Sequence, residues 1–253
     1  MKSIDLNCDL GEREDFAADV QELLLESVTS ANIACGAHAG SEALMRLTVA
    51  QALGHGAAIG AHPGYPDRAN FGRLEPALPL EEIESGVEQQ VRTLMRIAAQ
   101  AGAEVRYVKP HGALYNQAAR DPALAAAIAR AVARVQPSLW LVGLAGSGML
   151  QVWSEAGFRV AAEAFADRRY EPDGSLRSRR HGDALLDSPG AAAAQALAIA
   201  LEGAAVAPNG SIVRIHAQTL CIHGDTPGAA AIARAIRRRL EEHGVSVRSW
   251  IGS

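Results

Sequence analysis

The sequence predicts an α/β protein, a single-domain, TIM-like β/α barrel of seven or eight parallel strands. Short apolar runs alternate along the chain with helical stretches of roughly 10 to 20 residues, which is the pattern of repeated βαβ units. Polar turns follow most of the runs, and a closed ring explains this better than an open sheet, whose site is confined to one switch point. Because no linker or shift in composition divides the chain, we expect one domain over residues 1–253.

The strands are predicted where short apolar runs lie between turn residues and helical stretches. In chain order the runs are Ile4–Asn7, Ala31–Ala34, Ala57–Ala61, Val105–Lys109, Leu139–Leu144, Arg159–Phe165 and Ser211–His216, with Val245–Val247 as an eighth candidate. Polar turns follow the first four runs, the sixth and the last strand, so their side chains are expected at the carboxyl ends of the strands.

Helices are predicted between the strands, and residues at their ends support several of them. Ser41 is a suitable N-cap for the second helix, which stops at Gly54. Asp121 is a suitable N-cap for the fourth, with Pro122 at its first position. The full set is Asp19–Val28, Ser41–Leu53, Leu80–Ala101, Asp121–Val135, Ala191–Leu201 and Ala229–His243.

Composition and charge exclude several classes of function. The 253 residues, 49% of them hydrophobic, are enough for a large core, and the net charge of −4 leaves no basic face for nucleic acid. The three cysteines, Cys8, Cys35 and Cys221, form no disulfide spacing and suit a reducing compartment. With no signal peptide and no apolar run of about 18 residues, we expect a cytoplasmic protein that does not contact the membrane.

The residues able to do chemistry gather in five segments, and each segment follows a short apolar run. They are DLNCDLGE (5–12), SANIACGAHAG (30–40), GAHPGYPD (60–67), VKPHGALYN (108–116) and IHGDTP (222–227). Five such turns predict one site assembled from the same end of many strands, and therefore an enzyme. In the first segment Asp9 lies past the strand, where a carboxylate can bind a metal or act as a base. Asp5 and Asn7 either share that role or cap the turn.

Histidines mark the second and third segments. His38 lies among small residues that permit close backbone approach, which a substrate needs, although a loop histidine is also common on a plain surface. His62 directly follows a strand and precedes two prolines that stiffen the loop, which favours a role in a rigid site over a structural turn. Asp67 either belongs to that site or caps the turn.

The fourth segment carries the most information, because Lys109 stands at a strand end and is followed by His111, Tyr115 and Asn116. A lysine there is costly to bury without an anion, so Lys109 holds either a substrate anion or one of the protein's own carboxylates. Glu163, near the end of an apolar strand, would place a charge in the barrel interior, and Lys109 is a plausible partner for it.

The remaining candidates come late in the chain. EAFADRRY (163–170) supplies Arg168, and the last segment supplies His223 and Asp225, of which Asp225 is equally suited to cap the final helix. No P-loop and no GxSxG elbow is present. The stretch GLAGSG (143–148) turns a strand into a helix and offers backbone N–H groups to a phosphate. Cys35 and Cys221 are more typical of buried thiols than of nucleophiles.

Taken in order, these segments strongly resemble the LamB/YcsF family, which comprises the A subunits of 5-oxoprolinase, nearly from end to end. The likeness rests on the five segments together with FGR (71–73), EAFADRRY and DG (173–174). It implies a barrel of the glycoside hydrolase/deacetylase type. It also implies a part in the ATP-dependent opening of 5-oxoproline to L-glutamate, together with partner subunits B and C. The chain departs from the family pattern at Ser41, where an aspartate is usual, and at Leu74, where an arginine is usual.

A fainter likeness to metal-dependent sugar deacetylases implies a divalent metal at Asp9, His62 and His111. The candidates for catalysis are then Asp9, His38, Lys109, His111 and Glu163. The candidates for substrate binding are Asn7, Arg73, Tyr115, Asn116, Arg168, His223 and Asp225. ATP is expected as co-substrate, bound mainly by the partner subunits because the chain has no nucleotide motif. Two alternatives remain, a stand-alone metal-dependent amidohydrolase or deacetylase and a non-catalytic substrate-binding subunit.

Overall fold

A closed barrel of seven parallel strands forms the centre of the molecule. The computed structural model describes residues 2–13, 18–224 and 228–251. The strands follow each other round the ring in the order β1, β2, β3, β4, β5, β6 and β9, and β9 pairs with β1 from Asp5↔Thr219 to Cys8↔Ile222 to close it. Their bounds are Ser3–Leu10, Ser30–Ala34, Ala58–His62, Val105–Val108, Trp140–Leu144, Val160–Phe165 and Thr219–Ile222. The predicted fold class is confirmed.

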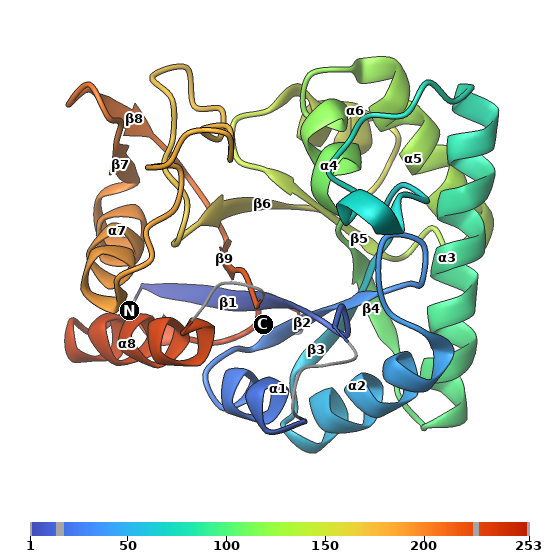
Figure 1. The fold of residues 1–253 in the computed structure, drawn as a ribbon, viewed down its shortest axis with the longest axis horizontal. Helices are drawn as coiled ribbons and strands as arrows, with labels where there is room; N and C mark the ends of the chain where they lie inside the picture. The colour runs from blue at the N-terminus through green and yellow to red at the C-terminus, as the bar shows by residue number, and fades with distance from the viewer. Residues whose placement is uncertain (1, 14–17, 225–227, 252–253) are drawn as a thin grey trace.

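Helices surround the barrel, as Figure 1 shows. Those that the sequence predicts are α1 (Ala18–Leu25), α2 (Glu42–Gly54), α3 (Leu80–Gln100), α5 (Pro122–Val135), α7 (Pro189–Glu202) and α8 (Ala229–Glu242). The Ser41 hydroxyl accepts from the backbone N–H of Leu44, and Asp121 caps α5 in the same way, so both predicted N-caps are confirmed. The sequence did not predict α4 (Gly112–Ala118) or the 3-10 turn η1 (Arg68–Asn70). It gave no bounds for α6 (Gly148–Glu155), which begins where the stretch GLAGSG was expected to lead into a helix. In the described part of the chain no helix is both long and apolar enough to cross a membrane.

The predicted seventh barrel strand, Ser211–His216, is wrong. Within it, β8 (Ile212–Arg214) pairs antiparallel with β7 (Ala204–Val206), and this hairpin lies outside the barrel (Figure 1). The ring is completed by β9, whose four residues are all fully buried. The eighth candidate is partly confirmed, because β10 (Ser246–Val247) extends the sheet by pairing with Ser3 and Ile4 at the start of β1.

The barrel interior is polar near the carboxyl ends of the strands. Along β1, Asp5, Asn7 and Asp9 alternate with apolar residues, and Asn7 reaches Glu163 of β6 across the ring at 3.0 Å. Tyr107 of β4 fills the interior beside β3 because Gly60 has no side chain, and a Cβ there would lie 2.0 Å from the ring. The Tyr107 hydroxyl donates to Asn32 Oδ1 at 2.7 Å. These interlocked polar groups support the residues that line the site above them.

Candidate functional site

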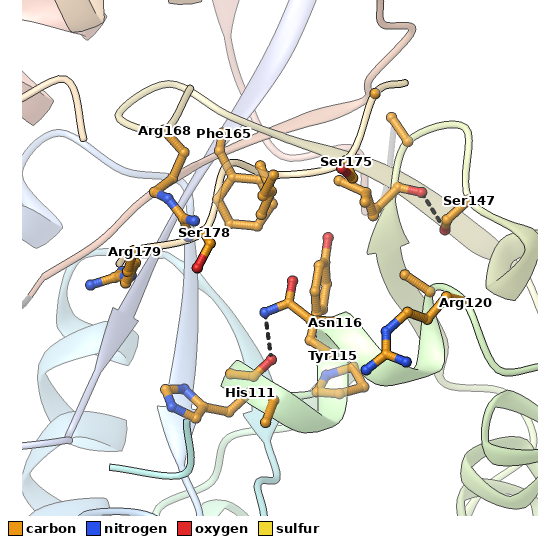
Figure 2. Close-up of a pocket in the computed structure, with 18 of the residues that line it drawn as sticks. His111, Tyr115, Asn116, Arg120, Ser147, Phe165, Arg168, Ser175, Ser178 and Arg179 are labelled. Carbon is orange, nitrogen blue, oxygen red and sulfur yellow. Dashed lines mark hydrogen bonds between the residues drawn. The ribbon is translucent and has the colours of Figure 1, made fainter. Parts of the chain in front are cut away.

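A cavity of about 1040 Å³ opens at the carboxyl ends of the strands. It brings together residues from distant parts of the chain, because parallel strands in a barrel end on the same face. The predicted residues that line it are Asp9, His62, Arg73, Lys109, His111, Tyr115, Asn116, Arg168 and His223. Figure 2 shows Tyr115 and Asn116, from α4, projecting into the middle of the cavity above His111.

Two backbone carbonyls determine which nitrogens of His62 and His111 carry protons. His62 Nδ1 lies 2.7 Å from the carbonyl oxygen of Lys109, and His111 Nε2 lies 2.9 Å from that of Phe71. A carbonyl oxygen only accepts hydrogen bonds, so both ring nitrogens must be donors. In the neutral rings the other nitrogens, His62 Nε2 and His111 Nδ1, are therefore unprotonated, and they face each other at 3.0 Å. Two lone pairs at this distance repel unless a cation or a proton joins them.

Two carboxylates approach the same point. Asp9 Oδ2 lies 3.4 Å from His62 Nε2, and Glu12 Oε1 lies 3.3 Å from His111 Nδ1. One ligand atom from each of these four residues falls within 4.8 Å of the others. Two imidazoles and two carboxylates are donors that suit Zn²⁺ and related divalent ions. The described residues therefore fit the predicted metal, and they add Glu12 to the predicted set of Asp9, His62 and His111.

Both carboxylates are held in the charged form. Burial alone would raise the pKa of Asp9, but the charges of His62 and Lys109 hold that pKa well below its usual range. Burial likewise opposes the charge on Glu12, but hydrogen bonds from His111 and His38 lower its pKa. The centre thus places two charged carboxylates beside the two imidazole nitrogens that face each other.

His38, predicted as catalytic, does not line the cavity. Its ring stacks on that of His111 at 3.7 Å with an interplanar angle of 4°, and its Nε2 lies 3.3 Å from Glu12 Oε1. Burial, followed by the nearby His111, lowers the pKa of His38 to about 4, so the ring is neutral at neutral pH. In this position His38 orients His111 and Glu12 from behind.

Lys109 lies at the floor of the cavity, 2% exposed, and its ammonium group contacts several acceptors. Nζ lies 2.9 Å from Asp9 Oδ1, 3.0 Å from Glu163 Oε1 and 3.3 Å from Asn7 Oδ1. Burial would lower the pKa of Lys109, but the two carboxylates hold it well above its usual value. The expected pairing of Lys109 with Glu163 is confirmed, and an ammonium group so surrounded acts mainly as a fixed positive charge.

The other predicted residues occupy different depths. Asn7 and Glu163 lie beneath Lys109, outside the cavity wall, where the Asn7 amide donates to Glu163 and to Thr219 at 2.6 Å. Asn116 donates to the carbonyl of Gly112 in its own helix at 3.0 Å. The Tyr115 hydroxyl has no hydrogen-bond partner among the described residues, and burial together with the charge of Glu163 raises the pKa of Tyr115. Asp225 lies outside the described residues.

Several functional residues were not predicted from the sequence. Glu12 belongs to the first polar segment, two residues beyond β1, and its place in that turn was the available signal. Asp167 accepts from both the backbone N–H of His223, at 2.9 Å, and the ring Nδ1, at 3.0 Å, and so fixes His223 at the cavity edge. Asp67, left open by the sequence, accepts from the N–H of Asn70 and caps η1.

Similarity to known proteins extends over the whole chain. The LamB/YcsF family profile matches residues 4–252. A protein of Chloroflexus aggregans, named as the A subunit of 5-oxoprolinase, is 51% identical over 250 residues, which cover 98% of this chain and 99% of that protein. An Agrobacterium fabrum protein of the same name is 47% identical over 251 residues, 99% of this chain and 98% of its own. The crystal structure of a lactam utilization protein from Thermus thermophilus is 42% identical, with a TM-score of 0.91 over 98% of this chain and all of that one.

Proposed function

Because this chain belongs to the LamB/YcsF family, we propose that it is the A subunit of an ATP-dependent 5-oxoprolinase, which hydrolyses 5-oxo-L-proline to L-glutamate. The observation that carries the proposal is the full-length similarity to proteins of that name, about half of whose residues are identical. The cavity supports it, because hydrolysis of a lactam needs groups that activate water and groups that stabilise negative charge on oxygen.

The residues at the floor can divide these tasks. In the hydrolysis, water adds to the ring carbonyl carbon, the C–N bond breaks, and the nitrogen leaves with a proton as the amine of glutamate. When the His111 ring is neutral, its Nδ1, next to Glu12, can accept the proton of the water. Lys109 supplies a fixed positive charge beneath the reacting carbonyl, where negative charge develops on the oxygen. The hydroxyl of Tyr115, which lies near Glu163, is a further hydrogen-bond donor in the wall.

A divalent metal, if it forms part of the resting enzyme, would be held by Asp9, Glu12, His62 and His111, and would supply Lewis acidity at the same point. His38 then keeps its positioning role, since it contacts Glu12 and stacks on His111.

ATP and the partner subunits complete the proposal. A lactam amide is stabilised by resonance, and phosphorylation of its carbonyl oxygen by ATP, with release of ADP, would make the carbon more electrophilic. When water has added and the nitrogen has left, an acyl phosphate remains, and a second water hydrolyses it to glutamate and inorganic phosphate. We assign that step and the nucleotide site to subunits B and C, because the chain contains no P-loop. The three cysteines, all free and buried, are consistent with the cytoplasmic location predicted from the sequence.

Turnover of 5-oxoproline by this chain, with and without subunits B and C and ATP, tests the proposal. Glutamate should form only in the complete mixture. His111→Ala should abolish at least 99% of it, about 3 kcal/mol of lost transition-state stabilisation. His243→Ala, at the exposed C-cap of α8, should leave it unchanged. Full activity of the His111→Ala complex would instead indicate that the chain only binds substrate. Hydrolysis of ATP by the isolated chain would contradict the assignment of the nucleotide site.

A second candidate is a stand-alone metal-dependent amidohydrolase or deacetylase, and the four converging metal donors favour it. Hydrolysis of an N-acetyl sugar by the isolated chain with Zn²⁺, without ATP, would support this function. The absence of such hydrolysis, together with turnover of 5-oxoproline in the complete mixture, would exclude it.

A further inference from the structure

The walls of the cavity are rich in positive charge, although the whole chain has a net charge of −4. Among the described residues the lining includes seven cationic side chains, Lys109, Arg73, Arg120, Arg168, Arg179, Arg180 and Arg214, against three carboxylates, Asp9, Glu12 and Asp173. At the floor Lys109 is already balanced by Asp9 and Glu163. Of the arginines in the walls, Arg120 pairs with Glu75.

Arg168 and Arg179 are the part of this wall best suited to an anion. Arg168 is only 6% exposed and donates from Nη2 to the carbonyl of Arg177 at 2.6 Å, while its Nε has no hydrogen-bond partner among the described residues. Figure 2 shows the side chain of Arg168 beside Ser178, with Arg179 on the same side of the cavity. Burial, and then the charge of Arg179, lowers the pKa of Arg168 to about 10, so the two guanidinium groups lie close enough to repel.

The acids of this segment are engaged elsewhere. Glu171 and Asp183 both pair with Arg177, at 2.8 Å and 2.7 Å. Asp167 accepts from His223. In the described part of the chain no carboxylate lies within ion-pair distance of Arg168. The charge of Asp167 offsets part of the cost of burying this guanidinium, and an anion from solution would offset more of it.

We propose that Arg168, Ser178 and Arg179 form a phosphate-binding subsite in the cavity wall, which takes the phosphate group of a phosphorylated substrate. A guanidinium fork matches two phosphate oxygens, and a neighbouring hydroxyl can donate to the third. The cavity of about 1040 Å³ is far larger than a five-membered lactam needs, so it has room for a phosphate beside the ring. The assignment to a phosphorylated substrate rests on the proposed function, whereas phosphate binding itself does not.

Binding of inorganic phosphate and phosphoenolpyruvate to the isolated chain, measured by calorimetry at constant ionic strength, tests the subsite. Phosphoenolpyruvate carries its phosphate on a trigonal carbon and also has a carboxylate. A phosphorylated 5-oxoproline would share both groups, with its carboxylate on the far side of the ring nitrogen. We expect both ligands to bind and phosphoenolpyruvate to bind several-fold more tightly. Arg168→Gln should weaken both by about tenfold or more, and Arg168→Lys, which keeps the charge but loses the fork, by less.

The matched control is Arg96→Gln, because Arg96 is an exposed arginine of α3 that pairs with Glu42 away from the cavity. It should leave phosphate affinity unchanged. Arg179→Gln provides a second variant in case Arg168→Gln alters the segment, and thermal unfolding confirms that each variant is folded. Equal weakening by Arg96→Gln, or none by Arg168→Gln and Arg179→Gln, would overturn the subsite. Equal affinity for the two ligands would overturn its assignment to the substrate, and 5-oxoproline binding as tightly as phosphoenolpyruvate would assign the wall to carboxylates instead. None of these results depends on turnover.

Discussion

At the scale of single residues, the buried pair of Lys109 and Glu163 is a feature of the site that the sequence alone predicted. Each was recognisable as a charge next to an apolar strand, and each therefore needed the other. In the structure Lys109 also contacts Asp9, so one ammonium group balances two carboxylates. Such a group stabilises the fold only while its partners are present.

Lys109→Met should therefore destabilise the protein and abolish activity. It leaves Asp9 and Glu163 buried without a counter-charge, at a cost of about 3–5 kcal/mol in the free energy of unfolding by urea. The double variant Lys109→Met/Glu163→Gln should recover part of that loss. Arg106→Gln, which breaks the exposed pair with Glu104, is the control and should cost less than about 1 kcal/mol. A Lys109→Met protein as stable as Arg106→Gln would refute this account of the floor.

Asp5 predicts a pH dependence of stability. It accepts hydrogen bonds from Thr29, Ser30 and Thr219, but burial raises its pKa from 3.8 to about 6. The folded state thus holds the proton more tightly than the unfolded state. The contribution of Asp5 is complete below about pH 3.8 and is lost as the pH rises through about 6.

We expect Asp5→Asn to remove this dependence. The stability of the original protein relative to Asp5→Asn should rise by on the order of 3 kcal/mol between pH 7 and pH 4, as measured by urea unfolding at each pH. A difference that is constant across this range would show that Asp5 titrates normally.

The positions of other residues in the site could not be predicted from the sequence, because they depend on how turns fold and how rings stack. Glu12 is one acid among 28, and only the fold of the turn after β1 places it against His38 and His111. His38 was predicted as a member of the site, but its place behind His111, rather than in the cavity wall, depends on ring stacking that no spacing encodes.

At the scale of elements, the turn after η1 sets the position of both His38 and His111. Gly72 has a φ of 64°, and a Cβ there would lie 2.7 Å from His38 Cβ and 3.1 Å from His111 Cδ2. The turn is tied to the second polar segment by Arg68, which donates to the carbonyls of Gly36 and Gly40 at 2.8 Å. The close approach of this turn to the two imidazoles requires glycine.

Gly72→Ala should lower both stability and turnover. Gly56 is the matched control, because its φ of 67° is similar but nothing lies within 4 Å of an added Cβ. Gly56→Ala should cost about 1–2 kcal/mol of unfolding free energy, from the left-handed backbone alone. Gly72→Ala should cost a further 1–3 kcal/mol, on the order expected for overpacking, and should alone reduce activity. Equal effects of the two changes would show that the imidazoles do not depend on the turn.

At this scale, the strands show how much of the barrel the pattern of apolar runs and turns could predict. Six of the seven barrel strands were predicted because each is a short apolar run followed by a turn or a helix, and the seventh was misplaced by a few residues. The run Ser211–His216 is longer than the four residues of β9, yet it forms a hairpin strand with β7. Pairing partners decide between two such runs, and local sequence does not contain them.

At the scale of the whole molecule, the barrel brings together four metal donors that lie far apart in the sequence. Asp9 is the first of them along the chain and His111 is the last. A cation bound there would link β1, β3 and β4, so it would stabilise the folded protein against global unfolding. Its binding should be visible in the stability of the entire domain rather than of one loop.

Zn²⁺ added to chelator-treated protein should therefore raise the midpoint of thermal unfolding. At a concentration about a hundredfold above Kd the gain is about 2.7 kcal/mol, or roughly 5–10 °C for a domain of this size. His62→Ala should abolish most of the shift, and His243→Ala, at the C-cap of α8, should preserve it. A shift that survives His62→Ala would place the metal elsewhere, and no shift at all in the original protein would count against a zinc site.

The carbonyl groups of Lys109 and Phe71, which determine the protonation of His62 and His111, have a consequence for how this protein can be studied and how it can vary. Every amino acid carries the same carbonyl, so replacement of the Phe71 side chain leaves its contribution in place, and a mutational scan would record no role for it. The path of the main chain, and not the identity of these two residues, determines which ring nitrogens of His62 and His111 carry protons. Only a change to the backbone itself, such as an ester in place of the amide that follows Phe71, would weaken that acceptor and expose its part in the chemistry.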